Sequence, residues 1–192
     1  MPEDNLISVG DLWFKPIISE DTIKEEVVKM GAQLANEFKD KNPILVGVLN
    51  GCFIFMADLV RAMNIPCEIA FLRMKSYEGT VSSGKMDVVL PPDISFEGRT
   101  VLLVEDIVDS GKTLAFLYDM LYKAKVLSVT SVALLYKPMA IKYPIQLDHH
   151  CFSIANEFVI GYGLDFNEQG RQLSHLYQLT KQYLDMVIVV QM

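Results

Sequence analysis

Residues 101–114 of this chain, VLLVEDIVDSGKTL, decide its fold. The apolar run at 101–104 is typical of a buried strand. Two adjacent acids follow it, then a third acid, and then a Ser-Gly-Lys-Thr turn that opens a helical stretch. Backbone N–H groups at the first turn of a helix bind anions, and a pair of carboxylates can reach sugar hydroxyls or a divalent metal. The stretch therefore predicts a cradle for a phosphorylated sugar.

The end of this stretch also matches the nucleotide-binding P-loop at residues 111–113. That motif requires another glycine at the position where this chain has Asp106, and a carboxylate there would stand where a phosphate approaches the backbone. The P-loop interpretation therefore fails. A plainer alternative makes Asp109 or Ser110 a helix cap and the acid pair a solvated strand end. We favour a ligand site, because α/β sheets place ligands at the carboxyl ends of their strands.

Composition and charge predict a compact globular chain. Its 192 residues suggest a single domain over 1–192, with 51% hydrophobic and 21% charged residues. A net charge of −7 argues against a nucleic-acid or membrane partner. The three cysteines lack CxxC spacing, which predicts free thiols in a reducing cytoplasm. The first residues show no signal-peptide pattern and polar residues interrupt the apolar stretch at 44–60, so neither export nor a membrane span is expected.

Strands and helices are expected to alternate along the chain. Apolar residues at helical spacing predict a first helix between a cap at Ser19 and a stop at Asn42-Pro43. Further helices are expected over 53–63 and 113–123, and strands over 44–49, 66–72, 100–104 and 126–135. This alternation predicts an α/β fold with a mostly parallel central sheet flanked by helices. Two stretches break the rhythm: 76–85 is expected to be a loop, and 151–161 to form short strands.

The stretch at 101–114 resembles the motif of type I phosphoribosyltransferases, in their hypoxanthine-guanine form, that binds 5-phosphoribosyl 1-pyrophosphate (PRPP). The likeness runs from about Leu45 to Arg171, with every block in the family's order. It implies the family's sheet flanked by helices, with a small hood formed by the N-terminal segment and residues from about 140 to 192. It also implies Mg²⁺ as cofactor, PRPP and a 6-oxopurine base as ligands, and a homodimer or homotetramer.

The resemblance assigns the ribose-phosphate site to residues of the opening stretch. Glu105 and Asp106 would engage the ribose hydroxyls directly or through Mg²⁺, and Asp165 would be a further acid near a metal. Asp109 matches the family's catalytic position, a proton partner at purine N7, and desolvation beside a purine would raise its pKa to suit that role. The 5-phosphate would be held by backbone N–H groups of Asp109, Ser110, Gly111, Lys112 and Thr113 and by the hydroxyls of Ser110 and Thr113.

Three further blocks resemble the family's pyrophosphate contacts and catalytic loop. Asn50 and Gly51 are similar to a loop in which a non-proline cis peptide turns a backbone N–H toward pyrophosphate. Many relatives have lysine in place of Asn50, so that charge is missing here, and an ordinary Asn-Gly turn is the alternative. Arg171 matches an arginine directed at pyrophosphate. Ser76 and Tyr77 resemble the start of a flexible loop that would close over the site and exclude water.

The base would be recognised by residues after the central strand. Lys137 ends a predicted strand and matches a lysine that donates to the purine 6-oxo group. Adenine presents an amino donor at that position, which an ammonium cannot accept, so 6-oxopurines are favoured. Phe158 would stack on the base, with the Val159 backbone at its edge and Asp165 nearby. Taken alone, Phe158 is also explained as a core residue.

These blocks together predict an enzyme of purine salvage. It would transfer the phosphoribosyl group from PRPP to hypoxanthine, with guanine as a second candidate, and yield IMP or GMP and pyrophosphate. Two alternatives stay open: a non-catalytic PRPP- or nucleotide-sensing regulator on the same fold, and a xanthine phosphoribosyltransferase. A sensor needs neither a proton partner nor a closing loop, so Asp109, Lys137, Arg171 and the Ser-Tyr pair argue against the first.

Overall fold

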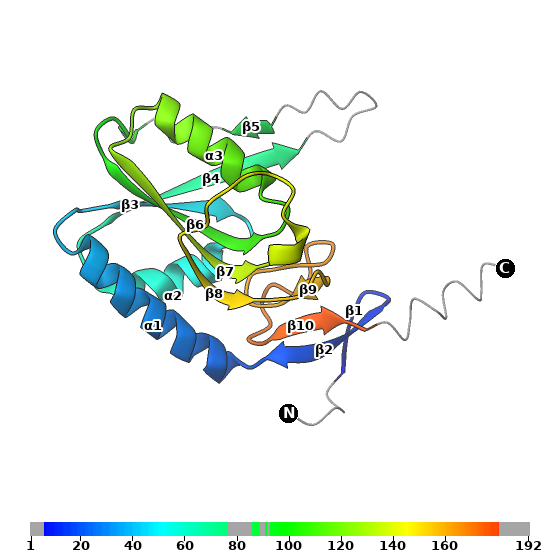
Figure 1. The fold of residues 1–192 in the computed structure, drawn as a ribbon. Helices are drawn as coiled ribbons and strands as arrows, with labels where there is room; N and C mark the ends of the chain where they lie inside the picture. The colour runs from blue at the N-terminus through cyan, green and yellow to red at the C-terminus, as the bar shows by residue number, and fades with distance from the viewer. Residues whose placement is uncertain (1–5, 77–85, 89–90, 92, 181–192) are drawn as a thin grey trace.

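The computed structural model describes residues 6–76, 86–88, 91 and 93–180. Within them, a six-stranded sheet forms the centre of the molecule and a four-stranded antiparallel sheet accompanies it (Figure 1). The larger sheet has the order β5-β4-β3-β6-β7-β8, and its neighbouring strands are parallel except for β5 on β4. In that order its strands span Met86–Val88, Glu68–Ser76, Ile44–Leu49, Thr100–Val108, Ser128–Tyr136 and His149–Ser153.

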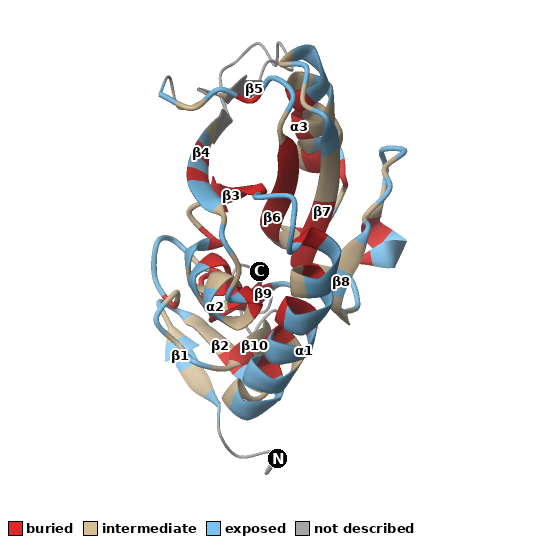
Figure 2. Cartoon of the chain, turned by 90° about the vertical axis from the view of Figure 1, so that its left-hand side faces the viewer, coloured by how far each residue is buried: buried red, intermediate tan, exposed pale blue. Residues whose placement is uncertain are grey.

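Helices cover both faces of the larger sheet (Figure 1). They span Glu20–Phe38 (α1), Phe53–Met63 (α2) and Lys112–Lys123 (α3). Leu102 and Val104 of β6 belong to the hydrophobic cluster of α1 and α2, whereas Val101 and Leu103 belong to the cluster of α3. Because both faces of β6 pack against helices, its run at 101–104 is apolar without alternation, and the strand is buried over most of its length (Figure 2).

The smaller sheet joins segments from the two ends of the described chain. Its order is β1-β2-β10-β9, and its strands span Ile7–Val9, Leu12–Ile18, Leu176–Leu179 and Val159–Ile160. Phe14 of β2 and Leu176 of β10 are fully buried. The sheet lies on the side toward which the carboxyl ends of β6, β7 and β8 point (Figure 1). This is the side on which parallel α/β sheets bind ligands.

The predicted elements are largely confirmed, and the differences lie at their ends. β3 and α2 have the predicted bounds, and Ser19 caps α1 by accepting a hydrogen bond at 3.2 Å from the Thr22 N–H. The strand expected at 100–104 was too short, because β6 continues to Val108 in a ladder with β7. Glu105 and Asp106 therefore lie within the strand, and successive strand residues point to opposite faces.

Smaller corrections concern the neighbouring elements. β4 and β7 begin later and end later than predicted, at Glu68–Ser76 and Ser128–Tyr136, and α3 begins at Lys112. The short strands expected at 151–161 are β8 and β9. Ser76 is the last residue of β4, and residues 77–85 of the predicted loop lie outside the described residues. No helix in the described part of the chain is long and apolar enough to cross a membrane.

Candidate active site

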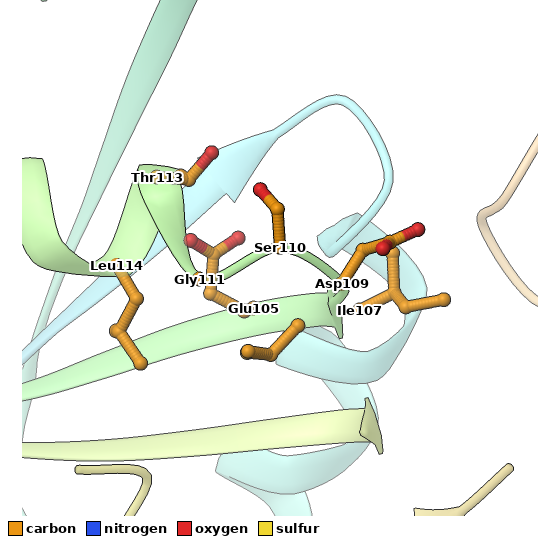
Figure 3. A pocket seen from close by; sticks show the side chains of 8 residues that line it. Glu105, Ile107, Asp109, Ser110, Gly111, Thr113 and Leu114 are labelled. Atoms are coloured by element: carbon orange, nitrogen blue, oxygen red, sulfur yellow. The ribbon is translucent and has the colours of Figure 1, made fainter. Parts of the chain in front are cut away.

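The turn between β6 and α3 encloses a cavity of about 80 Å³ (Figure 3). Gly111 caps α3 with a φ of 81°, a left-handed conformation that favours glycine. The hydroxyls of Ser110 and Thr113 point to the same side of the turn (Figure 3). The first N–H groups of a helix have no helical partner, so this turn presents the donors that a phosphate group needs. The cavity is lined by Glu105, Ile107, Val108, Asp109, Ser110, Gly111, Thr113 and Leu114.

A segment about thirty residues further along braces this turn. The carbonyl of Ser110 accepts hydrogen bonds from the backbone N–H groups of Lys142, at 2.9 Å, and Tyr143, at 3.2 Å. Ile145 packs so closely on Gly111 that a Cβ there would lie 3.1 Å from its side chain. Sequence reasoning missed these contacts, because nothing local in either segment indicates the other.

The two acids of β6 occupy different environments. Glu105 is only 4% exposed, and its Oε1 atom has no hydrogen-bond partner among the described residues. Its carboxylate points toward Gly111 and the start of α3 (Figure 3). Burial, and then the charge of Asp106, raise the pKa of Glu105 well above its usual value. Burial also raises the pKa of Asp106, to about 6, against backbone hydrogen bonds and the Arg171 charge, which lower it.

The loop after β3 lies directly against Asp106. The peptide bond between Leu49 and Asn50 is cis, which confirms the non-proline cis peptide expected in this loop. A Cβ on Gly51 would lie 1.6 Å from Oδ2 of Asp106, so only glycine allows this approach. On the other side, a Cβ on Gly163 would lie 2.1 Å from the carbonyl oxygen of Gly51. The structure thus brings the loops at 50–51 and 161–165 to the same acid of β6.

Arg171 is held within the loop that follows β9. Its Nη2 atom lies 2.8 Å from Oδ1 of Asp165 and 2.8 Å from Oε2 of Glu168. Its Nη1 donates to the carbonyl of Gly163 at 3.0 Å. The charges of Arg171 and Asp165 both act on the pKa of Asp106, the first lowering it and the second raising it. Asp165 and Arg171 therefore belong to the same site as Asp106 and Gly51.

The opposite end of the turn carries an ion pair. Nζ of Lys137 donates to Oδ2 of Asp109 at 2.8 Å. Lys137 follows β7, while Asp109 follows β6, and these strands are parallel neighbours. The lysine is buried, whereas the Asp109 side chain is 51% exposed. The residue expected to contact the base and the residue expected to exchange a proton with it are therefore direct neighbours.

Phe158 is 43% exposed, so it is not a core residue. Its ring lies 6.4 Å from that of Phe14 and meets Phe166 edge-on at 6.0 Å, which leaves part of the ring open to a planar ligand. Val159 is buried in β9 opposite Gln178 of β10. Two expected loop residues cannot be placed alongside them: Ser76 is described by its backbone alone, and Tyr77 lies outside the described residues.

A sequence model with the description "Phosphoribosyl transferase domain" matches residues 19–167. The chain belongs to the phosphoribosyl transferase family. The matched range contains all of the candidate site residues named above except Arg171. It also contains the segment at 142–145 that contacts the turn between β6 and α3.

Curated relatives of this phosphoribosyl transferase domain match it over most of its length. The hypoxanthine-guanine phosphoribosyltransferase of Streptococcus pneumoniae is 43% identical over 163 residues, which cover 84% of this chain and 91% of the relative. The bifunctional protein TilS/HprT of Listeria monocytogenes is 42% identical, but the match spans only 25% of that longer relative. A solved structure of Trypanosoma cruzi hypoxanthine phosphoribosyl transferase has a TM-score of 0.83 at 33% identity, and the match covers 95% of this chain and 100% of that one.

The resemblance implies Mg²⁺, and the residues around Asp106 fit such an ion. Within the described part of the chain, no group of three or more His, Cys, Asp or Glu side chains is arranged to hold a metal. The three expected ligands are thus not gathered into one cluster, and Glu105 and Asp106 point to opposite faces of β6. Mg²⁺ usually binds one or two carboxylates together with substrate phosphates and water. Asp106 and Asp165, whose charge acts on the pKa of Asp106, would provide that pair.

Proposed function

We propose that this protein transfers the 5-phosphoribosyl group of PRPP to N9 of hypoxanthine, and also of guanine. The bond between C1 of the ribose and the pyrophosphate oxygen breaks, the bond from C1 to N9 forms, and the base loses one proton. The products are IMP or GMP and pyrophosphate. The ion pair between Lys137 and Asp109 carries this proposal, because it joins a buried cation suited to a 6-oxopurine to the turn that would cradle a phosphate.

The phosphate of PRPP would occupy the cavity between β6 and α3. Ser110, Gly111 and Thr113 supply backbone N–H groups and hydroxyls there, and Lys112 adds positive charge at the rim. The ribose would lie over the end of β6, between Glu105 on the side of the cavity and Asp106 on the side of the loop at 50–51. Each carboxyl group would approach the ribose hydroxyls, and the charge that develops on the sugar, from its own face of the strand. A preorganised set of such groups stabilises a cation-like transition state without rearrangement.

The base would lie between Lys137 and Phe158. The Lys137 ammonium would donate to the 6-oxo group, Phe158 would stack on the ring, and the Val159 backbone would meet its edge. Purine binding would place N7 near Asp109, which would accept the N7 proton as N9 attacks the sugar. Because Lys137 holds Asp109 in the free protein, the purine would meet a carboxylate that is already oriented.

Pyrophosphate would leave on the opposite side of the sugar. Backbone N–H groups of Asn50 and Gly51 and the guanidinium of Arg171 are suited to its oxygens. Mg²⁺ bound at Asp106 and Asp165 would neutralise charge on the departing pyrophosphate. Ser76 and Tyr77 would begin a loop that closes over the site and keeps water from the reacting sugar.

The hood, the oligomeric state and the cellular location of this protein are also part of the proposal. The sheet β1-β2-β10-β9 would be the hood over the base, since Phe158 directly precedes β9. Ile69 and Phe71 share one face of β4 and are 47% and 41% exposed, which favours a homodimer or homotetramer that covers them. All three cysteines are unpaired, as expected for a cytoplasmic protein.

One assay separates this function from its alternatives. The protein is incubated with PRPP, Mg²⁺ and each of hypoxanthine, guanine, xanthine and adenine in turn, and pyrophosphate release is followed. We expect release with hypoxanthine and guanine. Release with xanthine alone would favour a xanthine phosphoribosyltransferase, and release with adenine alone would contradict the role of Lys137. PRPP binding without release for any base would indicate a sensor.

A further inference from the structure

The turn at 161–163 has an unusual backbone. Its three residues, Gly161, Tyr162 and Gly163, have φ values of 99°, 48° and 104°. Positive φ is easy for glycine but uncommon for a bulky residue such as tyrosine. A residue stays in this region only when its surroundings hold it there, and such positions gather at functional sites. The surroundings of Tyr162 are therefore informative.

Tyr162 is fixed by both its backbone and its side chain. Its N–H donates to the carbonyl of Leu173 at 2.7 Å, and the residue is only 6% exposed. Its hydroxyl donates to Oδ2 of Asp58, a residue of α2 that also pairs with Arg61. Burial, and then the contact with Asp58, raise the pKa of the Tyr162 hydroxyl, so this group stays protonated and remains a donor. A hydrogen bond from a hydroxyl to a carboxylate is stronger than one between neutral groups.

This hydrogen bond connects two parts of the candidate site. Asp58 lies in α2, whose start directly follows the loop at 50–51, and Gly163 abuts the carbonyl of Gly51 in that loop. On the other side of the turn, β9 carries the proposed base contact Val159, and Asp165 follows. The turn at 161–163 thus lies between the base side and the pyrophosphate side of the site.

We propose that Tyr162 and Asp58 are positioning residues that hold the turn at 161–163 against the loop at 50–51, the pyrophosphate loop. Neither residue touches the reacting atoms. Their hydrogen bond sets where Gly163 presses on Gly51, and so where the backbone N–H groups of the pyrophosphate loop point. This role rests on the proposed function, because the proposed function assigns pyrophosphate to that loop. The positioning role adds that a tyrosine hydroxyl remote from the ligands controls the affinity for PRPP and pyrophosphate.

Tyr162→Phe tests this proposal, with Tyr118→Phe as a matched control. The Tyr118 hydroxyl also donates to a carboxylate, Oδ2 of Asp148 at 2.9 Å, but it lies between α3 and β8, away from the pyrophosphate loop. Both variants should lower Tm, because each loses a hydrogen bond to a carboxylate. Only Tyr162→Phe should raise KM for PRPP, by about tenfold, while kcat changes less. Equal KM values in the two variants would overturn the proposal.

Three further variants keep the test decisive if Tyr162→Phe folds poorly. Asp58→Asn retains an oxygen that accepts from Tyr162 but loses its charge, so KM for PRPP should rise less than in Asp58→Ala. Arg61→Gln removes the other partner of Asp58. The Arg61 side chain is 76% exposed, so this variant should leave KM unchanged. An equal rise in KM in Asp58→Asn and Asp58→Ala, or a rise in Arg61→Gln, would contradict a role for the hydrogen bond itself.

A binding measurement separates this proposal from the proposed function. Isothermal titration with Mg-pyrophosphate is carried out on the wild type, Tyr162→Phe and Tyr118→Phe. Weaker binding in Tyr162→Phe alone would support the positioning role even if no base were ribosylated. Equal binding by all three proteins, or no binding by the wild type, would overturn it.

Discussion

Nζ of Lys137 lies 2.8 Å from Oδ2 of Asp109, and the two side chains differ sharply in burial, at 8% and 51% exposed. The cation is thus enclosed by protein while its counter-ion is half exposed. A buried charge depends on its partner, whereas an exposed carboxylate can be solvated by water instead. The pair is therefore asymmetric, and this asymmetry has consequences for both stability and catalysis.

Removing Asp109 should lower the free energy of unfolding more than removing Lys137. Asp109→Ala leaves the Lys137 ammonium buried without its anion, and should lower the free energy of unfolding by about 2 to 3 kcal/mol. Lys137→Met leaves only a half-exposed carboxylate and fills the space with an apolar chain, so its effect should be much smaller. Urea unfolding of both variants checks this prediction. An equal loss in both would contradict the asymmetry.

Substitutions of Lys137 and Asp109 should affect different kinetic constants, KM for the base in one case and kcat in the other. Lys137→Met removes the proposed donor to the 6-oxo group and should raise KM for hypoxanthine by about 100-fold, with little change in KM for PRPP. Asp109→Asn keeps an acceptor oxygen but cannot take a proton, and should lower kcat by about 100-fold or more. Lys123→Met, which breaks the exposed pair with Asp119, serves as the control. A near-normal kcat in Asp109→Asn would count heavily against its role as proton partner.

Asp106 should make stability depend on pH. Burial raises its pKa from 3.8 to about 6, so the folded protein binds this proton more tightly than the unfolded chain does. The stability that protonation contributes is complete below pH 3.8, is lost as the pH rises to about 6, and stays lost above that. Asp106→Asn should therefore be more stable than the wild type at pH 7, by about 2 to 3 kcal/mol.

Unfolding at several pH values measures this effect. The advantage of Asp106→Asn should shrink as the pH is lowered from 6 toward 4, where the wild-type carboxyl is protonated in the folded state. Asp93→Asn, an exposed site outside the cavity, is the control. A constant difference over that range would show that burial of the Asp106 charge is not its cause.

Gly163 should tolerate no side chain. Gly163→Ala would place a Cβ 2.1 Å from the Gly51 carbonyl at a φ of 104°, and should destabilise the protein by about 3 kcal/mol or more and weaken pyrophosphate binding. Gly98 also has positive φ, 71°, but a Cβ there meets nothing within 4 Å. Gly98→Ala should therefore cost only about 1 kcal/mol of backbone strain, with no change in binding. Equal effects of the two substitutions, measured by urea unfolding and calorimetry, would contradict the contact between the loops.

Local patterns were sufficient for most of the fold. The apolar spacing of α1 and the unbroken apolar run of β3 indicate the period and burial of each element directly. The end of β6 was missed because its last residues pair with β7, and such pairing depends on a register between strands that no local window contains. The opposite orientation of Glu105 and Asp106 follows from that longer strand.

The site was predictable where its residues lie in one short motif, as in the turn at 109–113. Contacts between distant segments were not. Tyr162 and Asp58 are 104 residues apart, and the brace of Ile145 on Gly111 also joins separate loops. The glycines on either side of Tyr162 were a signal: they do not form a dinucleotide fingerprint, but they mark a turn with positive φ.

Base selection by the Lys137 and Asp109 pair is the central claim, and a competition assay tests it most directly. The protein is given limiting PRPP and Mg²⁺ with equal concentrations of hypoxanthine and adenine, and the nucleotides and pyrophosphate are measured by chromatography. We predict IMP and pyrophosphate in equal amounts, with AMP near background. AMP as the main nucleotide, or PRPP left intact, would contradict the account.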